Sequence, residues 1–279
     1  MKKISLLVVV FSLLFIVSGS TGFCAEPYRI LIANDDGIES EGILALAKAL
    51  EDVGSVTVVA PMKNYSGIGH GLTIDGPLML DEIKREGKFF GYGVDATPAT
   101  CVKIAIDRIV NPAPDLVVTG INAGINLGKI LYVSGTFNAA QEAVMNGIPA
   151  VAFSLERGKK LDFTVAAEFA REFIIKMKKR GFPKNVTINV NIPAGSKDEI
   201  KGVKVTTLSD FQFTDVWTKR KTPWGKTYYW GKIKYPTNEP KKGSDHWALK
   251  EKIISITPVL LEYNNEPAMK TLSDFRMDF

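Results

Sequence analysis

Short apolar runs alternate with helix-like patterns along the first two thirds of the chain. Residues 28–33 are mostly apolar, and apolar side chains then recur every three or four positions over residues 40–50. The first pattern predicts a strand and the second an amphipathic helix. Another strand is predicted over residues 56–60, where Pro61 ends it and a glycine-rich loop follows at residues 66–71. The chain therefore begins by alternating strands with loops and helices.

Four further segments continue this alternation. Residues 115–119 form a nearly continuous apolar run, which is typical of a strand buried on both faces of a parallel sheet. A helix is predicted over residues 137–145, a buried strand over 150–154 and a long amphipathic helix over 166–179. Strands that alternate with helices through right-handed crossovers give an α/β fold with a doubly wound, mostly parallel sheet. Its ligands are expected beyond the carboxyl ends of the strands.

The character of the sequence changes near residue 201. From there it is aromatic and rich in threonine and lysine, as around Trp217 and at residues 228–230, which favours hairpins over helices. We interpret residues 26–200 as an α/β core. Residues 201–279 are interpreted as a β-rich arm that completes the same domain.

The first residues have the layout of a secretory signal peptide. Lys2 and Lys3 precede an apolar run over residues 4–17, and small residues follow at 18–20. The run is shorter than the roughly 20 residues that a membrane-spanning helix needs. We therefore predict a leader over residues 1–25 and an exported, periplasmic protein that is not bound to the membrane. A retained single-pass anchor is the alternative interpretation.

Composition adds little to this picture. An apolar content of 46% is enough for a substantial core. The net charge of +5 falls to +3 when Lys2 and Lys3 leave with the leader, and such a small excess predicts no stable nucleic-acid partner. Without the leader Cys101 is the only certain cysteine, so a disulfide within the chain requires that Cys24 is retained.

Two adjacent aspartates follow the first predicted strand. Side chains alternate between the faces of a strand, so Asp35 and Asp36 can converge only where the chain leaves the sheet, as it does before Gly37. Neighbouring carboxylates repel each other, and a hard divalent cation allows both to stay ionised. The alternative is a turn or helix-capping pair ahead of Ser40.

Further oxygen ligands are predicted at the same edge of the sheet. Ser66, Asn122 and Asn126 all lie in loops that follow predicted strands, so they are placed to converge on the aspartates. The chain has only two histidines, His70 and His246, which disfavours a soft-metal site. Magnesium or manganese is therefore more plausible than zinc.

A small loop precedes the helix predicted from Phe137. Its residues Ser134, Gly135 and Thr136 offer two hydroxyls and backbone N–H groups, which together suit a phosphate at a helix N-terminus. An ordinary N-cap followed by glycine is the alternative interpretation of the same residues.

These loops carry ordered motifs at residues 32–37 (IANDDG), 59–61 (VAP), 64–67 (NYSG) and 119–128 (TGINAGINLG). Together they resemble the SurE family of metal-dependent 5'/3'-nucleotidases. The resemblance continues through residues 134–136 (SGT), 147–150 (GIPA), 189–193 (NVNIP) and 255–258 (SITP), and so covers nearly all of the chain after the leader.

The resemblance implies an αβα core, one divalent ion (Mg²⁺ or Mn²⁺) per subunit, and a carboxy-terminal arm exchanged within a homodimer or homotetramer. It implies that the ion is bound by Asp35, Asp36, Ser66 and Asn122. It also implies that the phosphate pocket is lined by Asn126, Ser134, Gly135 and Thr136. Familiar members of the family are mostly cytoplasmic, which makes a cytoplasmic location the alternative to export.

Two positions depart from the family pattern. Where the family usually has an acid two residues after its Thr-Pro pair, this chain has Thr100 before Cys101, which puts the role of that loop in doubt. Near the arm, the usual Thr-Asp-Phe is replaced by residues 244–246 (SDH), so that His246 takes the aromatic position.

The functional hypothesis is hydrolysis of nucleoside 5'-monophosphates, with 3'-monophosphates as further candidates, to nucleoside and phosphate. The ion would polarise a phosphoryl oxygen and activate a water for in-line attack, with Asp35, Asp36 and Asn126 as the catalytic residues. The alternative is an exported binding protein that holds a phosphorylated ligand without turnover. Such a protein would show two α/β halves of similar size, which the sequence after residue 201 does not favour.

Overall fold

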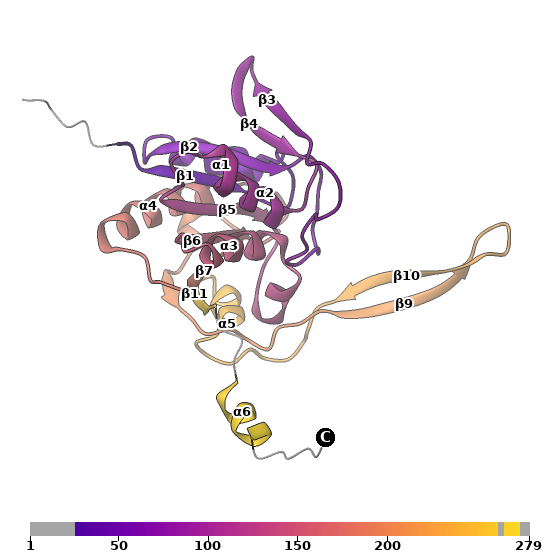
Figure 1. Cartoon of the computed structure of the whole chain (residues 1–279). Helices are drawn as coiled ribbons and strands as arrows, with labels where there is room; N and C mark the ends of the chain where they lie inside the picture. Colours follow the sequence, from indigo (N-terminus) through magenta and orange to yellow (C-terminus); the bar gives the residue numbers. More distant parts are fainter. Residues whose placement is uncertain (1–25, 262–264, 274–279) are drawn as a thin grey trace, which may run out of the picture.

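The fold is described from a computed structural model (Figure 1), in which residues 26–261 and 265–273 are described. The leader predicted over residues 1–25 lies outside this part of the chain. A nine-stranded sheet runs through the centre in the order β3-β4-β2-β1-β5-β6-β7-β11-β8. Its strands are β1 (Arg29–Ala33), β2 (Ser55–Pro61), β3 (Leu80–Arg85), β4 (Lys88–Val94), β5 (Leu116–Ala123), β6 (Ala150–Leu155), β7 (Val186–Ile192), β8 (Val203–Val205) and β11 (Ile254–Leu260).

The strands from β4 to β7 in this order are parallel, whereas β3 and β11 pair antiparallel to their neighbours β4 and β7. The helices are α1 (Glu41–Leu50), α2 (Pro98–Ile104), α3 (Gly135–Met145), α4 (Thr164–Arg180), α5 (Asp245–Lys250) and α6 (Glu266–Ser273). A π-helical turn at Ala105–Ile109 and 3₁₀ turns at Gly128–Tyr132 and Lys197–Glu199 complete the set.

The helices cover both faces of the sheet. Ile30 and Ile32 of β1 join the apolar cluster that contains α1 and α4, whereas Leu31 and Ala33 join the opposite cluster with α2 and α3. Both faces of β1 are therefore buried, which explains its apolar run. The predicted αβα architecture with a mostly parallel sheet is confirmed (Figure 1).

The chain order reverses at β1, which lies between β2 and β5. Crossovers leave this strand on both sides, so the loops beyond its carboxyl end diverge and leave a crevice. Asp35 and Asp36 directly follow β1, and Asn122 lies near the end of β5. Between Thr119 and Asn122 the register of β5 against β6 shifts, an irregularity that re-aims side chains at the end of a strand.

The region after residue 201 differs in part from the predicted pattern. Its described residues contain one hairpin, formed by β9 (Thr214–Lys221) and β10 (Thr227–Lys234), and every residue of these two strands is exposed as the hairpin projects from the body (Figure 1). β8 and β11, however, belong to the central sheet. The chain also forms α5, whose N-cap Ser244 accepts a hydrogen bond from the backbone N–H of Trp247. Hairpins alone therefore do not account for this region.

None of the helices in the described ranges has the length and apolarity needed to cross a membrane.

Candidate metal and phosphate site

A cavity of about 480 Å³ lies at the carboxyl edge of the sheet. It is lined by residues from the loops after β1, β2 and β5, from the start of α3 and from both ends of the β9–β10 hairpin. Its lining residues include Asp35, Ser66, Gly67, Asn122, Ala123, Gly124, Ile125, Asn126, Ile130, Val133, Ser134, Glu156, Arg157, Phe213, Ile233 and Tyr235. We call it the carboxyl-edge cavity. Of the residues predicted from sequence to bind metal or phosphate, five line this cavity, namely Asp35, Ser66, Asn122, Asn126 and Ser134. Asp36, Gly135 and Thr136 are not among its lining residues.

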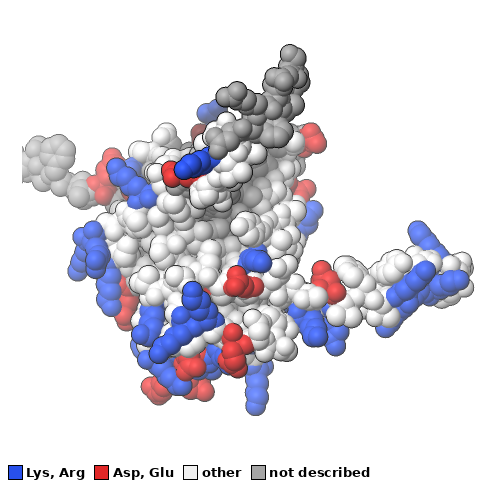
Figure 2. All heavy atoms as spheres, turned by 90° about the horizontal axis from the view of Figure 1, so that it is seen from below, with Lys and Arg blue, Asp and Glu red and all other residues white. Residues whose placement is uncertain are grey.

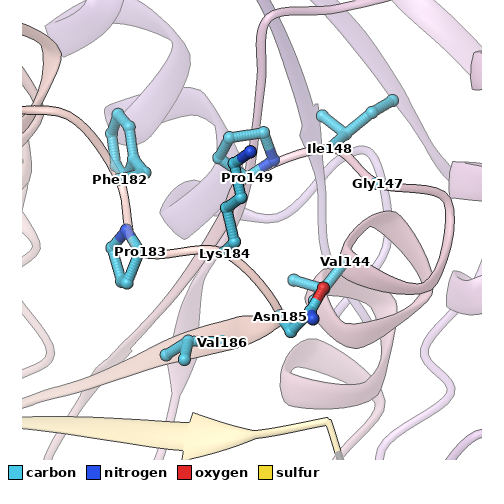
Figure 3. Close-up of a pocket in the computed structure, with 9 residues that line it drawn as sticks. All are labelled: Val144, Gly147, Ile148, Pro149, Phe182, Pro183, Lys184, Asn185 and Val186. Carbon is cyan, nitrogen blue, oxygen red and sulfur yellow. The ribbon is translucent and has the colours of Figure 1, made fainter.

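Another cavity, of about 320 Å³, lies where β6 and β7 begin (Figure 3). Pro149, Phe182 and Pro183 form much of its wall, and Lys184 is the ionisable residue among those that line it. No carboxylate is present among these residues, so this cavity does not offer the ligands that a hard cation needs.

The turn after β1 is fixed by Asn34. Its buried amide nitrogen donates to the carbonyl oxygen of Gly37 (2.9 Å) and to Oγ of Ser40 (2.8 Å), and its Oδ1 accepts from the N–H of Gly37 (3.2 Å). Gly37 has a φ of 101°, which is accessible to glycine at little cost. These bonds hold the turn that places Asp35 and Asp36 beyond the end of the sheet.

Asp35 is buried, with only 3% of its surface exposed. The pKa of its carboxyl is raised to about 6. Burial is the main cause and the charge of Asp36 adds to it, while a hydrogen bond donated by the hydroxyl of Thr136 acts in the opposite direction. A carboxylate in this environment is stabilised by any positive charge that reaches it.

Asp36 is more accessible and is held by the end of β5. Its Oδ2 accepts from the backbone N–H of Ala123 at 3.0 Å. Burial raises its pKa, whereas the hydrogen bond from Ala123 and the positive charge of Arg157 lower it. Arg157 is itself fixed by a bond from Nε to the carbonyl oxygen of Ala123 at 2.6 Å. Sequence reasoning did not identify this arginine, which no motif marks.

Two neutral oxygen donors complete the set. The amide nitrogen of Asn122 donates to the carbonyl oxygen of Gly124 at 3.0 Å, so its amide oxygen is the atom that can serve as a ligand. Ser66 lines the cavity, and its loop is tied to the turn after β1 because the N–H of Tyr65 donates to the carbonyl oxygen of Asp35 at 2.7 Å.

This donor set fits a hard divalent cation. Two carboxylates, an amide oxygen and a hydroxyl oxygen are ligands that Mg²⁺ or Mn²⁺ prefers. Within the described part of the chain no three residues of the types His, Cys, Asp and Glu cluster together, as a zinc site would require. The raised pKa values of both aspartates are a second reason to expect a cation here, because a positive charge offsets the cost of keeping both carboxyls ionised.

The three residues at the start of α3 make different contacts. Ser134 is the N-cap of the helix, since its Oγ accepts from the N–H of Phe137 at 3.0 Å, and it also lines the cavity. Thr136 is fully buried and donates to Asp35. Gly135 lies so close to Asp35 that an added Cβ would come within 2.6 Å of its Cβ. Of the three residues predicted here for phosphate, Ser134 reaches the cavity and the other two contact Asp35.

Asn126 is anchored by a network from β6 and β7. Its amide nitrogen donates to Oγ of Ser154 at 2.9 Å, and its N–H donates to Oδ1 of Asn191 at 2.8 Å. Its carbonyl oxygen accepts from the amides of Asn189 and Asn191. The sequence motif at residues 189–193 therefore supports the loop that holds Asn126, a role that the motif alone did not reveal.

Comparison with known proteins places this arrangement in a family. A family model described as Survival protein SurE matches residues 30–215. The chain belongs to the SurE family. The 5'-nucleotidase SurE of Thermoanaerobacter sp. (strain X514) is 41% identical over 239 residues, which span 85% of this chain and 94% of that protein. The protein of the same name from Chlorobium chlorochromatii is 37% identical over 251 residues, or 89% of this chain and 92% of that protein.

A solved structure agrees with this assignment. The SurE protein from Aquifex aeolicus has a TM-score of 0.78 and 38% identity, and the match covers 88% of this chain and 98% of that chain. The resemblance predicted from the sequence motifs is therefore confirmed.

The glycine-rich loop of this SurE-family chain is attached to α3 by a buried acid. Nε2 of His70 lies 2.8 Å from Oε2 of Glu142, and the N–H of Gly69 donates to the carbonyl oxygen of Val133 at 3.0 Å. The hydrogen bond with His70 is the main cause that lowers the pKa of Glu142. Lys103 lies 3.7 Å from the other carboxyl oxygen. Sequence reasoning missed this pair, because its two residues are far apart in the chain.

The two departures from the SurE pattern both have structural partners. Oγ1 of Thr100 accepts from the N–H of Thr73 at 2.8 Å and lies 2.9 Å from Oγ1 of Thr97. The hydroxyl of Thr100 is therefore the hydrogen-bond acceptor for the backbone at Thr73. His246 packs edge-on against Phe211, with ring centroids 4.6 Å apart, and burial lowers its pKa. Neither residue lines the carboxyl-edge cavity.

Proposed function

We propose that this protein is a divalent-metal-dependent phosphomonoesterase of the 5'-nucleotidase type, which hydrolyses nucleoside monophosphates to nucleoside and phosphate. The observation that carries the proposal is the adjacent pair of Asp35, which lines the carboxyl-edge cavity, and Asp36, which accepts from Ala123 of that lining. Both aspartates have raised pKa values, and the neutral oxygen donors Ser66 and Asn122 line the same cavity. The SurE relatives named 5'-nucleotidase support the same activity.

The metal is proposed to be one Mg²⁺ or Mn²⁺ per subunit, held by Asp35, Asp36, Ser66 and Asn122. When bound, such an ion acts as a Lewis acid toward a phosphoryl oxygen and acidifies a water ligand. The donor chemistry described above supports this choice over zinc.

The remaining residues of the chain have positioning and electrostatic roles in the proposal. Asn126 and Ser134 would bind the phosphoryl oxygens, because fixed dipoles stabilise the charge that develops on them. Thr136 holds the carboxylate of Asp35, and Gly135 allows α3 to approach that carboxylate. A water attacks phosphorus in line, the bond from phosphorus to the nucleoside oxygen breaks, and the nucleoside leaves with a proton.

The activity is tested by phosphate release from a panel of nucleoside 5'- and 3'-monophosphates, in Mg²⁺, in Mn²⁺ and in excess EDTA. We expect turnover that depends on the metal and is lost in Asp36→Asn. Asp210→Asn, on an acid that does not line the cavity, serves as the matched control. Tight binding without release in every metal would instead favour a binding protein.

Assembly through the arm is part of the proposal. We propose that residues 26–200 form the core and that residues 201–279 complete the same domain, with β8 and β11 in its central sheet. The contacts of a homodimer or homotetramer are proposed to lie in this second part. The β9–β10 hairpin supports this, since Trp217 and Trp230 are 62% and 61% exposed, an unusual amount of bare aromatic surface. Figure 2 shows Lys and Arg side chains along the same hairpin. Light scattering would detect a fall in mass when residues 216–232 are replaced by a short turn.

Export is proposed from the leader pattern at residues 1–25, with the periplasm as the location and the cytoplasm as the alternative. Amino-terminal sequencing of the protein from each cell fraction tests it. A periplasmic protein that starts near residue 26 supports export, and a cytoplasmic protein that retains Lys2 and Lys3 contradicts it.

A further inference from the structure

The carboxyl-edge cavity is lined by two unlike kinds of side chain. Its lining includes the oxygen donors Asp35 and Asn122, and it also includes the apolar and aromatic side chains of Ile233, Phe213 and Tyr235. Tyr235 is 58% exposed and Ile233 is 52% exposed, although both border a cavity. Apolar surface that borders a polar site without protein cover is typical of a ligand-binding wall.

Phe213 and Tyr235 pack against each other as an aromatic pair. Phe213 directly precedes β9 and Tyr235 directly follows β10, so the antiparallel pairing of these strands brings the two rings together. Their centroids are 5.1 Å apart at an interplanar angle of 85°. The buried ring of Phe211 supports both, at centroid distances of 5.7 Å and 6.4 Å. Such mutual packing fixes ring orientation before any ligand arrives.

The polar groups beside this pair already have partners. Glu156 accepts from the N–H of Ala194 at 2.9 Å and lies 3.5 Å from Lys252. Arg157 donates to the carbonyl oxygen of Ala123. These contacts to the chain hold both side chains in place, and the aromatic faces offer contact to any flat ring.

We propose that Phe213 and Tyr235 form a stacking surface for the nucleobase of the substrate, with little discrimination between purines and pyrimidines. The inference rests on the proposed function, because it places the phosphate at the aspartates and the base at the aromatic part of the same cavity. In this proposal the residues that flank the two hairpin strands, Phe213 and Tyr235, give selectivity for nucleotides over phosphate esters that lack a base.

The test compares AMP and CMP with ribose 5-phosphate, which has the sugar and phosphate but no base. In Phe213→Ala and Tyr235→Ala we expect kcat/KM for both nucleotides to fall about tenfold, mainly through KM, because stacking on an aromatic residue contributes this much per base. For ribose 5-phosphate the value should stay within about twofold. Tyr235→Phe should behave as wild type, since the ring and not the hydroxyl is used.

Two control variants distinguish the loss of base stacking from a general disruption of the β9–β10 hairpin. Trp217→Ala removes an exposed hairpin ring that does not line the cavity and should leave the ratio of AMP to ribose 5-phosphate unchanged. Phe213→Leu keeps apolar volume without a flat ring and should resemble Phe213→Ala, which guards against an alanine variant that fails to fold.

Equilibrium binding separates this inference from the proposed activity. If wild-type protein releases no phosphate from any compound, the activity fails, yet calorimetry with AMP and ribose 5-phosphate still tests the subsite. Tighter binding of AMP than of ribose 5-phosphate, lost in Phe213→Ala, supports it. Equal binding of the two compounds, or an equal loss for both in the variants, overturns it.

Discussion

The hydroxyl of Thr136, in the first turn of α3, donates a hydrogen bond to the buried carboxyl of Asp35, which follows β1. The two residues are 101 positions apart. The contact joins the loop predicted for phosphate to the first acid of the predicted metal site. It also lowers the pKa of Asp35 against the larger effect of burial.

Replacing this hydroxyl should make Asp35 harder to ionise. In Thr136→Val the donor is lost while the shape of the side chain is kept, so the pKa of Asp35 rises above about 6. We expect kcat/KM at pH 6 to fall about tenfold, in line with a lost hydrogen bond to a charged group, and the acid limb of the pH–rate profile to move to higher pH. Thr136→Ser retains the donor and should keep the wild-type profile. An unshifted acid limb in Thr136→Val would contradict this account.

Burial of Asp35 also predicts how stability depends on pH without metal. Its pKa is raised from 3.8 to about 6, so the native state holds this proton more tightly than the unfolded state does. The stability it contributes is present below about pH 4 and is lost as pH rises through 6, a change of roughly 3 kcal/mol. In EDTA, Asp35→Asn should therefore be more stable than wild type at pH 8 and similar at pH 4.

Urea unfolding at the two pH values measures this difference. Saturating Mg²⁺ should stabilise the wild-type protein at pH 8 and have little effect on Asp35→Asn, because binding to the native state alone shifts unfolding. Equal metal-free stabilities of the two proteins at pH 8 would show that Asp35 is not held in an unfavourable ionised state.

Much of the fold was predictable because the parallel strands are buried on both faces. The strands β1, β5 and β6 appear in the sequence as apolar runs, and the rule that ligands bind beyond carboxyl ends then located the cavity. The edge hairpin β3–β4 was not predicted. β3 is largely exposed and carries mixed charges such as Asp81 and Lys84, which protect an edge strand but hide its pattern.

The sequence predicted a set of candidate site residues but not the contacts among them. Residue type and loop position indicated Asp35 and Asp36. The bond from Thr136 to Asp35 and the network around Asn126 depend on side-chain directions across distant segments. Phe213 gave no local signal either, since it reaches the cavity only through the pairing of β9 with β10.

The pair of His70 and Glu142 should control how well the loop with Ser66 is placed. His70→Ala removes the contact that attaches this loop to α3. We expect the metal concentration for half-maximal activity to rise about tenfold, as when residues that support metal ligands are removed, while kcat at saturating metal stays within about threefold. Glu142→Gln keeps an acceptor and should have a smaller effect. Lys103→Ala removes only a half-exposed ion pair and is the control expected to match wild type.

The close contact between Gly135 and the side chain of Asp35 predicts a variant that loses activity but stays folded. A Cβ at Gly135 would lie 2.6 Å from Cβ and 2.8 Å from Oδ2 of Asp35, so Gly135→Ala must displace the carboxylate. Alanine itself favours helix, by about 1 kcal/mol relative to glycine, so the variant should remain folded. A displacement of this size should reduce kcat/KM about 100-fold. In the control Gly71→Ala, the three atoms nearest to the new methyl all belong to Ile68, at 3.2 Å or more. If Gly135→Ala keeps full activity, Asp35 tolerates movement, and its role as a fixed ligand must be abandoned.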